Sequence, residues 1–180
     1  MAETLLLGDS TPLLIREAEV QALAAGQLRS RGITGALHQL LELAESPFHV
    51  VRQAVRQSLS EFSFARFLAA FDLLDDEVRR STGRIVRKVD PACLSGLRAE
   101  LEAAVVKRRS RGLALAVVLD AVADVEDSIV RLIHDSDHLV RVEAVQTLAR
   151  GKSAAAYAAL TEAERDSSLA VVEAARQARA

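Results

Sequence analysis

The sequence predicts an all-α protein built from stacked pairs of helices. Apolar residues recur at intervals of three and four residues almost throughout, as in Val140, Ala144 and Leu148, and this spacing indicates amphipathic helices. Half of the 180 residues are hydrophobic, but only 3% are aromatic. A core of Leu, Val, Ile and Ala with so few aromatic rings is typical of close helix-on-helix contact.

Short breaks separate the expected helices, and most of them carry Asp, Ser or Pro, which cap or open a helix. Gly26 ends the first helix at 11–24, Ser46-Pro47 separates 34–45 from 48–61, Ser63 opens 64–74, and Asp75-Asp76 opens 76–89. Asp90-Pro91 opens 92–106, which 110–123 follows; Val125–Asp127 opens 126–134, Asp135–Asp137 opens 138–150, Gly151–Ser153 opens 153–164, and Asp166-Ser167 opens 168–178. Between Lys107 and Gly112 one long helix remains an alternative.

A short phrase, an aliphatic residue followed by Arg, recurs along the chain. It occurs as Ile15-Arg16, Val51-Arg52, Val78-Arg79 and Val140-Arg141, and without its arginine as Val171-Val172. The spacing averages about 31 residues, which is typical of stacked helical repeats. One copy is missing near residues 106–113, where neither Val106-Lys107 nor Leu113 is a clean match.

The repeated segments resemble the HEAT-repeat family, including its short HEAT-like variety. They read SPFHVVRQAVRQSL, DDEVRRSTGRIV and DSDHLVRVEAVQTL, with weaker copies in DSTPLLIREAEVQAL and DSSLAVVEAARQ, and they cover most of the chain. The resemblance implies a right-handed α-solenoid, a superhelix of about five antiparallel helix pairs, in a single domain over residues 1–180. Such pairs bury their apolar faces only against neighbouring pairs.

The resemblance also implies a ladder of ion pairs between neighbouring repeats. In it, the Asp of the turn within a repeat pairs with the Arg of the second helix. The implied members are Arg16, Arg52, Arg79, Arg141, Asp75, Asp76, Asp135 and Asp137. Asp75 or Asp76 would pair with Arg79, and Asp135 or Asp137 with Arg141. Because Arg52 has no Asp just before it and the third repeat has no clear Arg, interruptions are expected.

Basic residues are concentrated between residues 79 and 111. Ten bases face three acids there, a net charge of +7, whereas the whole chain carries −2. In a HEAT-like solenoid the second helices line the concave side, so this window predicts a concave basic patch able to receive an acidic peptide or a phosphate backbone. The predicted patch comprises Arg80, Arg84, Arg87, Lys88, Lys107, Arg108, Arg109 and Arg111. A solvated face with one structural arginine, Arg79, is the alternative.

Other candidate sites have simpler explanations. His134 and His138 flank Asp135–Asp137 and could suggest a metal site, but the repeat places these acids in a turn, so a capping role is favoured. Cys93 follows a helix start, yet no His partner is indicated, and a structural thiol is favoured. We therefore expect no metal, no cofactor and no catalytic residue.

The resulting functional prediction is a non-catalytic scaffold or adaptor that binds an acidic protein. Its open repeat ends could also support self-association. Two alternatives remain: a bilin lyase-like enzyme subunit, which some HEAT-like proteins of this size are, and a nucleic-acid-binding protein, less favoured because the basic window lacks aromatic residues for base stacking. One cysteine and no secretory signal or membrane-spanning stretch predict a cytoplasmic protein.

Overall fold

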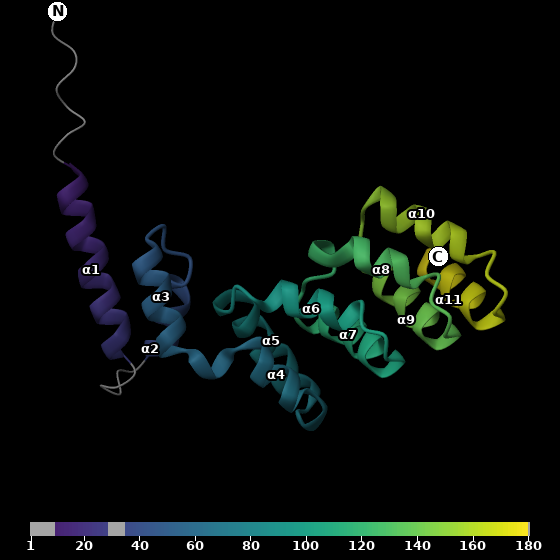
Figure 1. Cartoon of the computed structure of the whole chain (residues 1–180). Coiled ribbons are helices and arrows are strands. Elements are labelled where there is room, and N and C mark those ends of the chain that lie inside the picture. The colour runs from purple at the N-terminus through teal and green to yellow at the C-terminus, as the bar shows by residue number, and fades with distance from the viewer. Residues whose placement is uncertain (1–9, 29–34, 180) are drawn as a thin grey trace, which may run out of the picture.

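The computed structural model describes residues 10–28 and 35–179, and all regular structure in these two ranges is helical. The helices follow one another along an elongated molecule (Figure 1). The α-helices are α1 (Ser10–Leu28), α2 (Ala36–Leu43), α3 (His49–Ser58), α4 (Phe64–Ala70), α5 (Asp76–Val89), α6 (Cys93–Leu101), α7 (Val106–Val118), α8 (Glu126–Leu132), α9 (His138–Leu148), α10 (Ala154–Ala163) and α11 (Leu169–Arg179). Short 3-10 helices lie at Ser60–Phe62, Phe71–Leu73 and Ala123–Val125. The all-α prediction is confirmed for the described residues.

Several helices begin where the sequence supplies a capping side chain. Asp75 accepts a hydrogen bond from the backbone N–H of Val78 at 2.9 Å, and Ser153 accepts one from Ala156 at 2.9 Å. Asp90 connects the end of α5 to the start of α4, because one of its carboxylate oxygens accepts a hydrogen bond from the backbone N–H of Phe64 at 2.7 Å. These bonds satisfy N–H groups that the helix itself leaves without partners.

The predicted end of the first helix was wrong. α1 continues through Gly26 to Leu28. Its last turns lie against α3, where Ala25 is buried and its carbonyl oxygen accepts a hydrogen bond from the Ser58 hydroxyl at 2.9 Å. Contact with α3 thus stabilises a helical turn that glycine by itself disfavours by about 1 kcal/mol.

The boundary between α6 and α7 also differs from the prediction. The turn lies at residues 102–105, and the predicted break at 107–109 falls inside the first turn of α7. The turn reads Glu-Ala-Ala-Val and lacks the residues that usually indicate a turn. Gly112 lies within α7 instead, where an added Cβ would come within 2.9 Å of the Leu101 backbone nitrogen. That glycine allows α7 to approach α6 closely.

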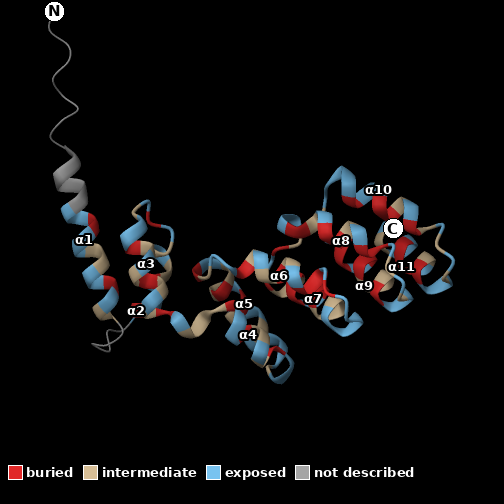
Figure 2. Ribbon diagram, in the orientation of Figure 1, coloured by how far each residue is buried: buried red, intermediate tan, exposed pale blue. Residues whose placement is uncertain are grey.

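The buried side chains form two clusters. The smaller lies among α1, α2, α3 and the end of α5, and the larger runs from α4 to α11. Figure 2 shows buried positions on the sides of the helices that face their neighbours. The partly buried Phe62 packs against both clusters and so connects them.

The second half of the chain has a regular packing pattern. The helices of each successive pair, α6–α7, α8–α9 and α10–α11, contact one another. Across the pairs, α7 packs on α9 and α9 on α11, while α6 packs on α8 and α8 on α10. The alternate helices therefore form two rows, a first row of α6, α8 and α10 and a second row of α7, α9 and α11 (Figure 1).

Candidate interaction surface

Three arginines make the same contact, each near the start of its helix: α3, α7 or α9. Each of Arg52, Arg109 and Arg141 points one guanidinium nitrogen at the carbonyl oxygens of the residues six and five positions earlier. The distances lie between 2.6 and 3.5 Å. Each arginine therefore holds the turn before its own helix, where the carbonyl groups have no helical partners.

Two of these arginines also bind the next turn along the chain through paired hydrogen bonds. Arg109 donates to the two carboxylate oxygens of Asp135 at 2.6 and 2.8 Å, and Arg141 donates to those of Asp166 at 2.8 and 2.9 Å. Paired bonds of this kind fix both distance and orientation. Since 26 and 25 residues separate the partners, the contacts tie neighbouring helix pairs together.

The electrostatics of both aspartates reflect this pairing. Burial raises the pKa of Asp135, but the hydrogen bonds from Arg109 and from the backbone N–H of Asp137 more than offset it, so the pKa lies below its ordinary value. For Asp166 the hydrogen bonds from Arg141 lower the pKa and outweigh the opposing effect of burial. Both side chains are therefore ionised at neutral pH.

The partners of Asp135 and Asp137 differ from those implied by the family resemblance. Asp135 pairs with the preceding Arg109, while Arg141 reaches the Asp135 turn through a backbone carbonyl. Asp137 caps α9 by accepting from the Leu139 N–H at 2.8 Å. Asp135 and Asp166 thus each face the arginine of the previous helix pair, while Arg141 donates to the carbonyl groups of the Asp135 turn.

The implied pairing of Arg79 with Asp75 or Asp76 is present as an ion pair between Arg79 and Asp76 at 3.2 Å, within one helix. Asp75 instead caps that helix. Arg79 also donates to the Phe71 carbonyl oxygen and stacks over its ring at 4.8 Å. Arg16 is exposed on α1 and has no hydrogen bond or ion pair with any residue that the structure describes.

Arg109 lies where one copy of the arginine phrase was missing, near residues 106–113, and sequence reasoning had not assigned it that place. It lies 30 residues after Arg79 and 32 before Arg141, close to the average period. Asp166 was missed too, although it follows Asp135 by 31 residues. The period alone could have indicated both positions, but Lys107-Arg108-Arg109 obscures the aliphatic-Arg phrase.

Most of the predicted basic patch is neutralised by carboxylates distant in sequence. Arg87 lies 3.0 Å from Asp124, and Lys88 lies 2.9 Å from Glu45. With Arg109 paired to Asp135, these contacts draw acids from three other segments of the chain. The +7 charge of the window therefore overstates the positive charge available to a partner.

Arg108 and Arg111 share one buried acid, Glu100, which is only 3% exposed. Each arginine donates two hydrogen bonds to a different oxygen of that carboxylate, and Arg111 also lies 4.0 Å from Asp72. Burial raises the pKa of Glu100, but the hydrogen bonds from both arginines outweigh this and lower it. These two bases therefore join α6 to α7.

Three members of the predicted patch keep exposed side chains without a carboxylate partner among the described residues: Arg80, Arg84 and Lys107. Arg80 and Arg84 lie one turn apart on α5, and Lys107 lies at the start of α7. Arg84 and Lys88 also line a hollow of about 230 Å³ against α2, together with Glu42 and His38. The predicted patch thus keeps three bases without a carboxylate partner in the described part of the chain.

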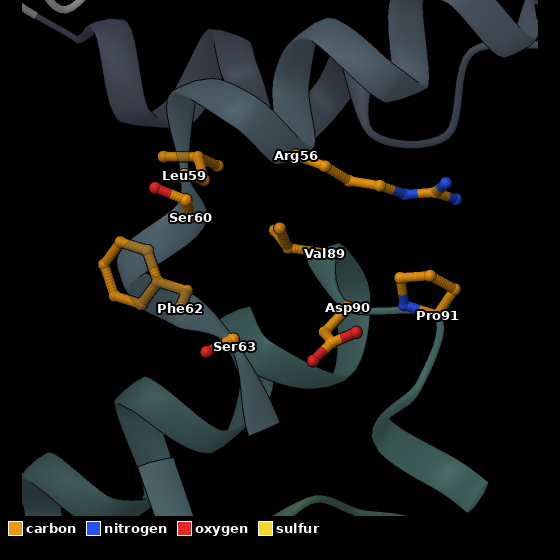
Figure 3. A pocket seen from close by; sticks show the side chains of 8 residues that line it. All are labelled: Arg56, Leu59, Ser60, Phe62, Ser63, Val89, Asp90 and Pro91. Carbon is orange, nitrogen blue, oxygen red and sulfur yellow. The ribbon is translucent and has the colours of Figure 1, made fainter. Parts of the chain in front are cut away.

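Figure 3 shows a second hollow, of about 210 Å³, between the end of α3 and the end of α5. Its walls are mainly apolar, with Leu59, Val89 and Pro91 among them. Arg56 extends along one edge, and Asp90 lies on the other side. Because Asp90 already caps two backbone segments, the polar part of this hollow is structural.

The remaining sequence candidates lie apart from one another. His138 begins α9, whereas His134 lies in the preceding turn, 3.7 Å from Glu162. No group of three His, Cys, Asp or Glu side chains within residues 10–28 and 35–179 could hold a metal ion. Cys93 is buried, and burial raises the pKa of its thiol to about 11, so it is protonated at neutral pH.

No protein-family model matches the sequence, and comparison with curated proteins finds no similar one. Among the helices of the described part of the chain, none is both long and apolar enough to cross a membrane.

Proposed function

We propose that this chain is a HEAT-like right-handed α-solenoid that acts as a non-catalytic protein-interaction scaffold. The observation that supports this most strongly is the repeated arginine contact of Arg52, Arg109 and Arg141, with its onward bonds to Asp135 and Asp166. These arginines lie 57 and 32 residues apart, about two periods and one period of 31 residues, which supports equivalent stacked units. Stacked units offer one long surface instead of one deep site.

Helices α5, α7 and α9 carry the proposed binding surface. Arg80, Arg84 and Lys107 are the bases on it that remain available to an acidic segment of a partner protein. The bases that already have a carboxylate partner contribute less to binding than these three. A charge already compensated at about 3 Å attracts a second acid only weakly. The same pairing reduces the attraction for a nucleic-acid backbone, whose binding scales with the number of free cationic groups.

The proposal is tested by comparing proteins captured from the native cell by the wild-type chain and by the double variant Arg80→Glu/Arg84→Glu. A matched control is Arg165→Glu/Arg176→Glu, which makes the same charge change at two exposed arginines near the C-terminus. We expect the first variant to lose acidic partners, whereas the control keeps them. Equal capture by both variants would refute the assigned surface, and recovery of a pigment or nucleic acid alone would refute the scaffold role.

A further inference from the structure

A polar groove lies between α7 and α9, which pack side by side in the second row (Figure 1). The hollow has a volume of about 280 Å³. One wall comes from α7 and the other from α9 and the turn after it. Its lining residues are Ser110, Leu113, Ala114, Val117, Glu143, Gln146, Thr147 and Arg150. None of them belongs to the predicted basic patch or to the arginine contacts.

Glu143 is the unusual member of this lining. Its Oε2 atom is shielded from solvent and has no hydrogen-bond partner among the residues described. Other carboxylates in this half of the molecule, such as Asp135 and Asp166, accept two bonds from an arginine. A carboxylate oxygen removed from water without a donor is unfavourable. A cationic donor that entered the groove would relieve that cost.

The neighbouring groups indicate the shape of such a donor. Leu113 and Val117 supply apolar surface on the α7 side, against which the methylene stem of Lys or Arg can pack while its charged head reaches a carboxylate. The negative charge of Glu143 is shared by both carboxylate oxygens, so a cation in the groove is attracted to the carboxylate although Oε2 is shielded. A partner carboxylate in the same place would be repelled by Glu143.

Arg150 also lines the groove and is exposed. Seven residues of helical rise place its backbone about 10 Å from that of Glu143. Because the side chain is exposed, its guanidinium can extend into water, where salt screens its repulsion of a cation at Glu143. It is also suited to binding a carbonyl oxygen of the chain that carries the cation.

We infer that the α7–α9 groove binds a lysine or arginine side chain of a partner polypeptide, with the charged head at Glu143. This inference rests on the proposed scaffold function and adds a second type of contact to it. A partner would then present acidic residues to Arg80 and Arg84 and a basic side chain to the groove.

The test uses the full chain labelled with nitrogen-15 and four capped pentapeptides, Gly-Ala-Xaa-Ala-Gly, with Lys, Arg, norleucine or Glu at the centre. Titration is followed through the backbone amide signals of Ala114 and Gln146 by NMR. We expect the Lys and Arg peptides to shift these signals at millimolar concentration and the other two to bind at least tenfold more weakly. Equal shifts with Lys and norleucine, or none with Lys, would overturn the inference.

Three variants locate the charge contact. Glu143→Gln should weaken the Lys peptide at least tenfold, because it removes the charge and keeps the shape. Glu173→Gln removes an exposed carboxylate from α11 and should change binding less than twofold. Ala114→Leu narrows the groove from an exposed position and should weaken every peptide.

Two outcomes of these titrations would contradict the assignment. One is unchanged Lys binding in Glu143→Gln, and the other is unchanged binding in Ala114→Leu, which serves even if the first variant does not fold. The peptide titration does not involve Arg80 or Arg84. Failure of the groove is therefore distinguishable from failure of the acidic-partner surface in the capture experiment.

Discussion

Arg109→Ala is expected to lower the free energy of unfolding by about 3 kcal/mol, because removing one member of a buried ion pair leaves the other charged and without a partner. The side chains of Arg109 and Asp135 are only 12% and 5% exposed. The substitution removes two bonds to Asp135 and two to the carbonyl groups of residues 103 and 104. By comparison, Arg80→Ala removes an exposed side chain and should change stability by no more than about 0.5 kcal/mol.

The direction of the pH dependence gives a second measure of the same contact. The folded-state pKa of Asp135 is lowered, so its contribution to stability is present above the unfolded value near 4 and is lost as the pH falls through the lower folded value. Without Arg109, burial still raises the pKa of this carboxyl, and only the backbone N–H of Asp137 and the charge of Arg141 oppose it, so the pKa is higher in the variant than in wild type. The stability difference between wild type and variant should therefore shrink as the pH is lowered below about 4.

Urea unfolding followed by far-ultraviolet circular dichroism measures these effects. Wild type, Arg109→Ala, Asp135→Ala and the double variant form a cycle, in which the double variant should be less destabilised than the sum of the single variants by about 2 kcal/mol. If Arg109→Ala costs no more than Arg80→Ala, or if the cycle shows no coupling, the assigned role of the Arg109–Asp135 pair is wrong.

Further predictions concern helix contact, thiol burial and acid stability. Gly112→Ala should destabilise by about 1 to 3 kcal/mol in urea, because its Cβ would meet Leu101, whereas Gly26→Ala, with nothing within 4 Å, should be neutral or stabilising. Cys93 should react with a thiol reagent only after denaturant is added, since burial raises its pKa to about 11; fast reaction in the native chain would contradict its burial. Asp166→Asn should reduce stability at pH 7 more than at pH 3, because the lowered pKa of Asp166 stabilises the fold only when it is ionised.

Local chemistry explains why much of the architecture could be predicted from the sequence. The three-four spacing of apolar residues and the capping Asp and Ser residues influence only neighbouring positions in the chain. The sequence therefore predicted the helices and most of the residues at which they begin. The predicted 76–89 helix coincides with α5, and 138–150 begins where α9 begins. The errors occurred where contacts between helices outweighed local preference, at Gly26 and at the unmarked turn of residues 102–105.

The sequence by itself determined that the chain is helical and that one arginine phrase recurs with a period of about 31 residues. Only the tertiary structure decided which charges remain available, because the partners of Arg87, Lys88 and Arg109 lie 26 to 43 residues away along the chain. A charge count within a window contains no distances, whereas the energy of an ion pair depends on separation and burial. The same reason hid Glu143, whose isolation from hydrogen-bond donors becomes visible only when α7 is packed against α9.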